Sequence, residues 1–169
     1  MESRYPSESR TILTDLVLPG ETNPLNNLFG GELLARMDRA AGIAAGRHSR
    51  RIVVTASVNH VAFSKAIPLG SVVTVEAKVS RAFKSSMEVV IDVWIEDRQT
   101  GDKTKANEAI YTFVAVNESG SPVSVPPIKP DTELEQQRYD AALRRKQLSL
   151  VLAGKMKPDD ATELKALFT

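Results

Sequence analysis

The chain has 169 residues, of which 42% are hydrophobic and 25% are charged, and its 22 Lys and Arg nearly balance its 21 Asp and Glu. This length suits one domain with a core of its own, and the near-neutral charge excludes the broad basic surface that a nucleic-acid partner requires. Because there are no cysteines and only two histidines, disulfides, thiolate metal sites and most zinc sites are excluded. No apolar run approaches the roughly 20 residues that span a membrane, and the N-terminus does not resemble a secretory signal. We therefore expect a cytoplasmic protein with no metal, no cofactor and no membrane or nucleic-acid partner.

The first part of the chain predicts a strand and a loop. Residues 1–10 are polar and are interpreted as a flexible leader. Thr11 to Leu18 is a β-rich run, and Pro19-Gly20 closes it with a strong turn signal. The next eight residues, 21–28, favour a loop because they contain three Asn and Pro24.

A helix is predicted from about Gly30 to Arg47. Its apolar and small residues recur at the spacing of one buried helix face: Leu33, Leu34, Met37, Ala40, Ala41, Ala44 and Ala45. So many alanines allow the helix to lie very close to a sheet. The opposite side carries Glu32, Arg36 and Arg39, which we expect to face solvent or another subunit.

Four long strands are predicted after the helix, at Ile52 to Phe63, Ser71 to Phe83, Ser86 to Arg98 and Lys103 to Asn117. Apolar residues alternate within them, which is the period of a sheet with one buried face. The connections are too short for crossover helices, so the strands should be antiparallel. The sequence thus predicts an α+β domain over residues 11–120, in which one helix cannot cover both sheet faces and an edge or face remains for a partner.

The last part, residues 121–169, predicts a Pro-rich connector followed by a helix and a tail. Four prolines between Ser121 and Pro130 favour an extended backbone. Asp131 is the expected cap of a charged helix that runs to about Gln147, on the surface or on a neighbouring subunit. Beyond it we expect a second short helix or a mobile tail.

Asp38 is the most informative side chain. At 100° per residue it lies on the border of the apolar helix stripe, so its carboxylate should be partly desolvated. Such a group either has a partner or acts as a general base. The alternative is a structural ion pair with an arginine at the helix edge.

The start of the helix and the loop before it offer polar groups near this carboxylate. Gly30-Gly31 leaves free backbone amides at the positive end of the helix dipole, where an oxyanion can bind, although tight packing at a bend explains the glycines equally well. Asn23 offers both a donor and an acceptor for a water or a carbonyl. Its alternative role is to form the turn before Pro24.

Cationic and hydroxyl side chains gather at the turn between two strands: Arg81, Lys84, Ser85 and Ser86. They suit a phosphate-bearing ligand, or they are an ordinary solvated hairpin tip. Neither His48 nor His60 has a carboxylate at useful spacing, so both are interpreted as structural or surface residues.

Several motifs, in order, resemble those of the cytoplasmic acyl-CoA hydrolases with a single hotdog domain, relatives of the brain acyl-CoA hydrolase. The motifs span about residues 10–145 and are Asn23 to Gly31, Leu34 to Asp38, Ala40 to Gly42, Val54 to Val58, Ile67 to Gly70, Ser86 to Val89 and Tyr111 to Ala115. The chain departs from the family pattern at Ser71 and at Lys84-Ser85.

The resemblance implies a hotdog fold, in which a five-stranded antiparallel sheet wraps a long central helix. It also implies that two chains pair into a dimer and that three dimers form a hexamer. It implies hydrolysis of acyl-CoA, with Asp38 as general base or nucleophile. Asn23 of the other subunit and the Gly31 amide would orient the water or polarise the carbonyl. Coenzyme A would bind near Arg81, Lys84, Ser85 and Ser86 and near Thr55 and Ser57. The alternatives are a non-catalytic acyl-CoA sensor and a hotdog enoyl-CoA hydratase.

Overall fold

The computed structural model describes residues 1–169. Its strands are β1 (Thr11–Leu16), β2 (Ile52–Asn59), β3 (Val72–Ala82), β4 (Ser86–Glu96) and β5 (Lys103–Val116). Its helices are α1 (Gly30–Ser49), α2 (Glu133–Leu152) and the short α3 (Thr162–Lys165), with single 3-10 turns at Pro6–Ser9, Pro19–Glu21, Pro158–Asp160 and Ala166–Phe168. None of the helices has the length and hydropathy of a membrane span.

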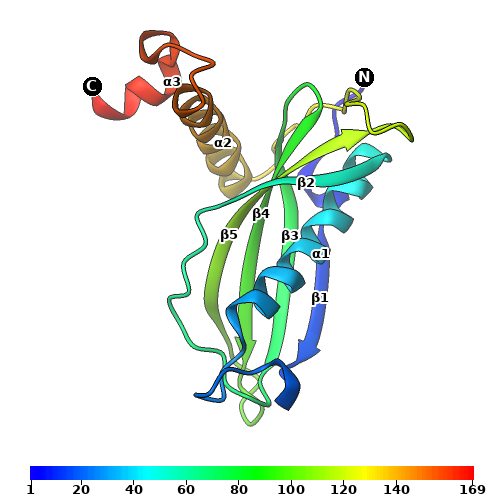
Figure 1. The fold of residues 1–169 in the computed structure, drawn as a ribbon, viewed down its shortest axis with the longest axis vertical. Coiled ribbons are helices and arrows are strands. Elements are labelled where there is room, and N and C mark those ends of the chain that lie inside the picture. The colour runs from blue at the N-terminus through cyan, green and yellow to red at the C-terminus, as the bar shows by residue number, and fades with distance from the viewer.

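All five strands form one antiparallel sheet in the order β1-β3-β4-β5-β2. The sheet curls around α1, and α2 lies on its outer side (Figure 1). This confirms the predicted α+β class and the hotdog fold. The strand β2 ends at Asn59, before the predicted Phe63, because His60 adopts a left-handed backbone conformation with φ 55°.

The core forms where the small residues of α1 meet the inner face of the sheet. Ala40, Ala41, Ala44 and Ala45 are fully buried, as are the inward residues of the two central strands, Val73, Val75, Ala77 and Val79 of β3 and Met87, Val89, Ile91 and Val93 of β4. A Cβ atom at Gly42 would lie 3.5 Å from the Phe113 ring of β5. The alanine face therefore brings α1 into close contact with the strands, which positions Asp38 near the sheet.

Arg36 contradicts the expectation that it faces solvent or another subunit. Its side chain is buried, and Nη2 donates hydrogen bonds to the Leu16 carbonyl at 2.8 Å and to both carboxylate oxygens of Glu21 at 3.0 Å. The reason is that the chain after β1 turns beside α1 and covers this guanidinium, whereas Arg39 stays exposed. Arg36 thus ties α1 to the loop that carries Asn23.

The first residues of the chain, expected to be a flexible leader, instead pack against the domain. Pro6 and Ser9 are buried, and Ser9 Oγ accepts a hydrogen bond from the Val79 amide at 2.9 Å. Arg4 Nη1 donates to the His48 carbonyl at 2.6 Å. This segment closes the end of the core beyond the C-terminus of α1.

The helix α2 begins and ends at other residues than predicted. Its cap is Thr132, not Asp131, because Thr132 Oγ1 accepts the Glu135 amide at 3.1 Å. It runs to Leu152, well past the predicted Gln147. Beyond it the chain forms the short α3, in keeping with the second short helix considered above.

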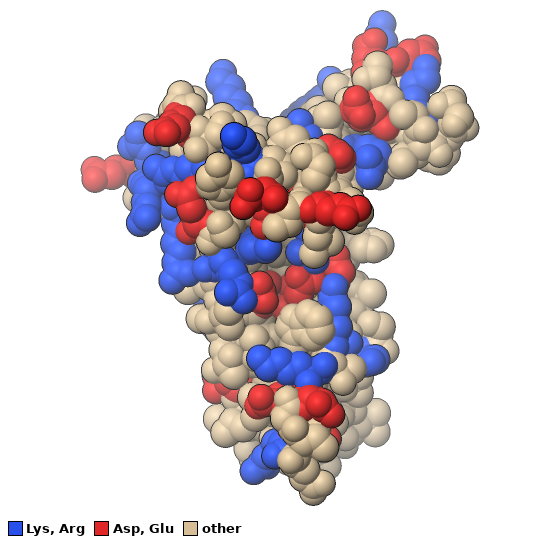
Figure 2. All heavy atoms as spheres, turned by 180° about the vertical axis from the view of Figure 1, so that it is seen from behind, with Lys and Arg blue, Asp and Glu red and all other residues tan.

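Ion pairs hold α2 on the outer face of the sheet. Arg138 pairs with Asp92 at 3.0 Å, Arg145 pairs with Glu88 at 2.8 Å, and Lys78 pairs with Glu135. Glu88 and Asp92 are buried beneath the helix. Figure 2 shows acidic and basic side chains next to one another over the middle of this side of the molecule.

The edge strand β2 exposes apolar side chains. Ile52, Val54 and Val58 are 56%, 47% and 44% exposed, and the strand pairs only with β5. An unpaired edge with exposed apolar residues is a surface for another chain.

Candidate functional site

Asp38 lies in the middle of α1, half-buried, facing β2. Its Oδ1 accepts a hydrogen bond of 2.7 Å from the Thr55 hydroxyl. The register of β2 against β5 shifts between Thr55 and Ser57, which marks a β-bulge directly after the threonine. The structure therefore gives Asp38 a hydroxyl donor and not the arginine of the alternative interpretation.

Tyr111 supports the same turn of α1 from the strand β5, and the sequence had not singled it out for this role. Its hydroxyl donates to the Leu34 carbonyl, one helical turn before Asp38, at 2.9 Å. Burial, and then the charge of Asp38, raise the pKa of Tyr111 to about 12. The phenol therefore stays protonated, as a fixed donor, at neutral pH.

Asn23 forms the turn before Pro24, the alternative role considered above, and its side-chain NH2 group stays free. Its Oδ1 accepts the amides of Leu25 at 3.0 Å and Asn27 at 3.2 Å. Its Nδ2 group has no acceptor within the chain. The side chain is thus fixed by its oxygen and offers its amide N–H groups as donors.

The start of α1 offers further donors. The amides of Gly30 and Gly31 donate to no acceptor within the chain, since the first intrahelical bonds come from Glu32 and Leu33. A Cβ at Gly30 would lie 3.5 Å from the Phe63 ring, and one at Gly31 would lie 3.6 Å from Phe29. Two half-exposed aromatic rings therefore flank the free amides, a feature that the sequence did not reveal.

The hairpin residues proposed for coenzyme A lie in different surroundings. Arg81 faces α2: its guanidinium carbon lies 3.9 Å from the Tyr139 ring centroid, and Nη1 donates to the Tyr139 carbonyl at 3.1 Å. Ser86 is buried, whereas Lys84 is exposed and Ser85 is partly exposed at the tip. A phosphate site at Arg81, Lys84, Ser85 and Ser86 stays a prediction.

Neither histidine joins the site. His48 is fully buried, and its Nε2 donates to the Pro126 carbonyl at 2.6 Å. Burial lowers the pKa of His48, so its imidazole is neutral at pH 7. His60 is exposed beyond the end of β2. Both therefore have the structural and surface roles that the sequence predicted.

Within one chain, Asp38, Thr55 and Tyr111 belong to one site, whereas no hydrogen bond joins Asn23 to Asp38. The one hydrogen bond of the Ser57 hydroxyl is with the side chain of Asn59, at 3.4 Å. Asp38 and the free Gly31 amide thus both belong to α1, whereas the free Asn23 donor lies in the loop before it.

The chain is similar to many known proteins, in sequence and in structure. Residues 25–101 match the family model described as the thioesterase superfamily. An uncharacterized acyl-CoA thioester hydrolase of Bacillus subtilis is 41% identical over 144 residues, which cover 85% of this chain and 84% of the relative.

Solved structures resemble the whole fold. A hexameric acyl-CoA thioesterase in its apo form superposes with a TM-score of 0.87 at 39% identity, over 90% of this chain and 98% of that one. An acyl-CoA hydrolase of Staphylococcus aureus, in complex with butyryl coenzyme A, coenzyme A and coenzyme A disulfide, gives 0.83 at 35% identity, over 97% and 99% of the two chains.

Alanine variants of the Staphylococcus aureus enzyme have also been solved, each with one residue replaced: an asparagine, an aspartate or a threonine. These three positions are separated by 15 and 17 residues in that enzyme. The same intervals separate Asn23, Asp38 and Thr55 in this chain.

Proposed function

Because this chain belongs to the acyl-CoA thioester hydrolases of the thioesterase superfamily, we propose that it hydrolyses acyl-CoA to a free fatty acid and coenzyme A at Asp38. The observation that carries the proposal is the half-buried Asp38 carboxylate, held by the Thr55 hydroxyl at 2.7 Å. The matching intervals of the asparagine, aspartate and threonine support it.

Asp38 acts in this proposal as general base or as nucleophile. As a base, it takes a proton from a water whose oxygen attacks the thioester carbonyl carbon. The C–S bond then breaks, and the leaving thiolate takes up the proton, which yields the acid and the free thiol. As a nucleophile, a carboxylate oxygen attacks the thioester carbonyl carbon and the C–S bond breaks, which leaves a mixed anhydride on Asp38 and the coenzyme A thiolate. Water then hydrolyses the anhydride to the free acid and the Asp38 carboxylate, and the proton that this water gives up goes to the thiolate.

The developing oxyanion needs fixed donors. The Gly31 amide, free at the positive end of α1, and the Nδ2 group of Asn23 have the right chemistry, because both lack acceptors within the chain. An oxyanion-hole donor typically contributes about 100-fold or more to turnover.

Assembly completes this site. Asn23 makes no contact with Asp38 in one chain, so we propose that Asn23 of one subunit meets Asp38 of its partner in a homodimer. The exposed edge of β2 supports this pairing, since Thr55 lies on the same strand. We further propose a hexamer built as a trimer of dimers, and the cytoplasmic location predicted from the sequence belongs to the same proposal.

A panel of acyl-CoA chain lengths, assayed by the release of free thiol, tests the activity. The protein has no cysteine, so a thiol reagent reports only the coenzyme A that is released. We expect turnover by the natural chain and losses of 100-fold or more, on the order of a general base's contribution, in Asp38→Ala and Asn23→Ala. Full activity in both variants would remove the mechanism.

Two other outcomes separate the alternatives. Binding of acyl-CoA without turnover would identify a sensor module. Hydration of an enoyl-CoA would identify a hydratase, although His48 is buried against Pro126 and is not placed to assist Asp38 in that reaction.

A further inference from the structure

Two phenylalanine rings stand exposed at the start of α1. Phe29 and Phe63 are each 55% exposed, and exposed aromatic groups that lie together mark a binding surface. Phe29 directly precedes α1, and a Cβ atom at Gly31 would lie 3.6 Å from Cδ1 of its ring. Phe63 reaches Gly30 in the same way, with 3.5 Å to its Cζ atom. The two rings therefore border the pair of glycines whose amides are free.

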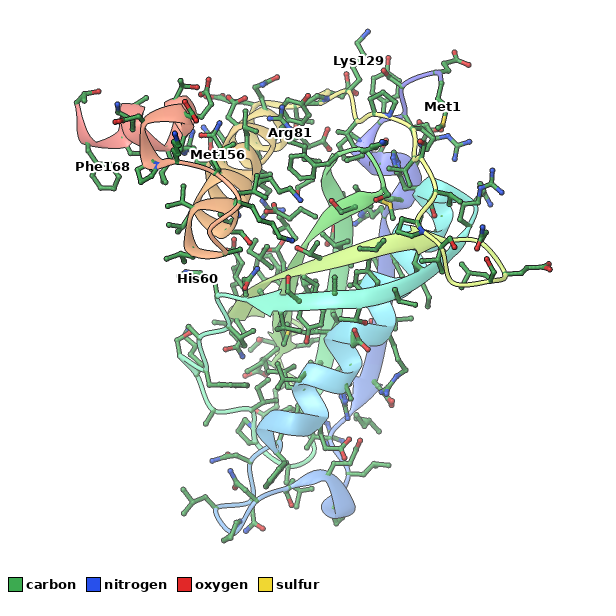
Figure 3. The ribbon with its side chains drawn as sticks, turned by 45° about the horizontal axis from the view of Figure 1, so that its top comes forward. Met1, His60, Arg81, Lys129, Met156 and Phe168 are labelled. Atoms are coloured by element: carbon green, nitrogen blue, oxygen red, sulfur yellow. The ribbon has the colours of Figure 1, made fainter.

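Phe63 belongs to residues 60–66, a segment without helix or strand that follows β2. Figure 3 labels His60, where the segment leaves β2, and Figure 1 shows it passing beside the sheet toward the start of α1. The segment is anchored next to the ring, because Ser64 Oγ donates to the Ala106 carbonyl at 3.1 Å. Ala106 has no partner in β4, since the register of β4 against β5 shifts at this point, which marks a β-bulge. The bulge therefore supplies the acceptor that holds Phe63 at the helix start.

This arrangement fits the two chemical parts of an acyl thioester. The carbonyl oxygen accepts hydrogen bonds, and the amides of Gly30 and Gly31 are donors without an acceptor within the chain. The alkyl chain gains free energy by leaving water, and the rings lie within contact distance of a methyl group placed on either glycine. Sites for small molecules combine a few fixed polar groups with an apolar lining in this way. A carbonyl held by these amides therefore places the first methylenes of its chain against Phe29 and Phe63.

The face of α1 that joins the rings to the carboxylate is also apolar. Gly31 and Asp38 lie nearly in line along the helix, because the seven residues from one to the other make almost two turns. Leu34 and Ala35 lie between them on this face, and both are partly exposed. The rings, the free amides and Asp38 thus border one continuous surface of α1.

We propose that Phe29 and Phe63 bind the first methylenes of an aliphatic acyl chain and so set the chain-length preference, with Ser64 as the residue that positions Phe63. The inference rests on the proposed hydrolysis of acyl-CoA. Moving one methylene from water onto an apolar surface is equivalent to about fourfold in kcat/KM, roughly 0.8 kcal/mol. The enzyme should therefore prefer butyryl-CoA and octanoyl-CoA to acetyl-CoA, whose methyl group is too short to cover a ring.

Steady-state hydrolysis of acetyl-CoA, butyryl-CoA and octanoyl-CoA by the full chain tests the assignment. In Phe63→Ala, kcat/KM for octanoyl-CoA should fall about 15-fold, the effect of two methylenes, whereas kcat/KM for acetyl-CoA should stay within about twofold. Phe29→Ala should show the same dependence on chain length. The matched control is Phe168→Ala, which removes a still more exposed ring (81%) near the C-terminus, away from α1 (Figure 3), and should change no substrate.

The anchor of the segment is tested in the same assay. Ser64→Ala removes the bond to the Ala106 carbonyl and should lower kcat/KM for octanoyl-CoA about fourfold, the effect of one methylene, with acetyl-CoA unchanged. Ser64→Thr keeps the hydroxyl and should restore the natural value. If Ser64→Ala hydrolyses octanoyl-CoA as fast as the natural protein, Ser64 does not position Phe63.

An equal loss for all three substrates in the phenylalanine variants would overturn the proposal. A ring that only supports the fold, the subunit contact or the pantetheine arm of coenzyme A acts on every substrate alike. Unchanged hydrolysis of octanoyl-CoA in both Phe29→Ala and Phe63→Ala would contradict it as well. Failure of the proposed function looks different, because the natural protein would then release no thiol from any of the three substrates.

Binding to Asp38→Ala gives a second readout that does not depend on turnover. In titration calorimetry, octanoyl-CoA should bind at least about 15-fold more tightly than acetyl-CoA, and the added Phe63→Ala should lower this ratio about 15-fold. A ratio that Phe63→Ala leaves unchanged would overturn the assignment of the ring, whatever the rate of hydrolysis.

Discussion

Replacing Thr55 with valine tests the contact on which the proposed chemistry depends. The substitution keeps the branched shape of the side chain and removes only the hydroxyl that donates to Asp38 Oδ1 at 2.7 Å. Valine is well suited to a strand, and Thr55 is exposed on the edge strand β2, so the fold should be unaffected. Any change in activity then reports on the carboxylate.

The size of the effect follows from the kind of hydrogen bond that is lost. A hydrogen bond to a charged group contributes about 1.5–3 kcal/mol, and the exposure of Thr55 places this one at the lower end. Because about 1.4 kcal/mol corresponds to a factor of ten in rate, we expect kcat to fall roughly 10-fold. In this scheme the hydroxyl orients the carboxylate, so the loss should appear mainly in kcat, and a change in KM would report the contact with coenzyme A that was predicted for Thr55.

The assay is steady-state thioester hydrolysis with Ser57→Ala as the control. Ser57 lies on the same strand and does not bond to Asp38; its one hydrogen bond is a 3.4 Å contact with Asn59, so its loss should leave kcat within about twofold, whereas its predicted contact with coenzyme A would show in KM. Thermal unfolding of both variants checks the fold. If Thr55→Val keeps the natural kcat while Asp38→Ala is inactive, Thr55 does not orient the carboxylate and the reasoning from this hydrogen bond is wrong.

Three further predictions concern the loop, the buried arginine and the buried histidine. Asn23→Asp keeps the oxygen that forms the turn and loses the Nδ2 donor, so kcat should fall about 100-fold with an unchanged melting temperature in calorimetry. Arg36→Met removes the bonds to Leu16 and Glu21 and should lower the free energy of unfolding by about 2 kcal/mol, whereas the exposed Arg39→Met should change it by less than about 0.5 kcal/mol in urea titrations. Burial lowers the pKa of His48 in the folded chain. As the pH falls below about 6.5, the unfolded chain binds a proton that the folded chain does not, so the free energy of unfolding decreases. Denaturation at pH 7.5 and 5.5 should reveal this slope, and His48→Gln should reduce it.

The helix α1, the strands and their inward faces could be predicted from the sequence because their periods are regular and their apolar residues numerous. The tertiary position of Arg36 could not, since it depends on how the chain folds back after β1. Tyr111 was missed for a similar reason: its hydroxyl meets the Leu34 carbonyl, 77 residues away in the sequence. Contacts of this range leave no local pattern.

Arg81 illustrates how a local irregularity decides the direction of a side chain. Regular alternation along β3 would turn its side chain inward, toward the core side where Val75, Ala77 and Val79 lie. The register shifts between Val79 and Arg81, which is a β-bulge, so that Ser80 and Arg81 both face α2. A one-residue irregularity thus sets the face on which Arg81 lies, and no residue type in the strand predicts it; the role of Arg81 toward coenzyme A stays a prediction.

The strand β2 also sets a condition on the newly made chain. Its sequence, Ile52–Asn59, contains neither lysine nor proline, the residues that commonly guard a free edge against unwanted pairing. A newly synthesised monomer therefore exposes an edge strand that can pair with other chains until the proposed homodimer covers it. Assembly therefore competes with aggregation during folding. The yield of folded protein then depends on the concentration of newly made chains and on chaperone capacity.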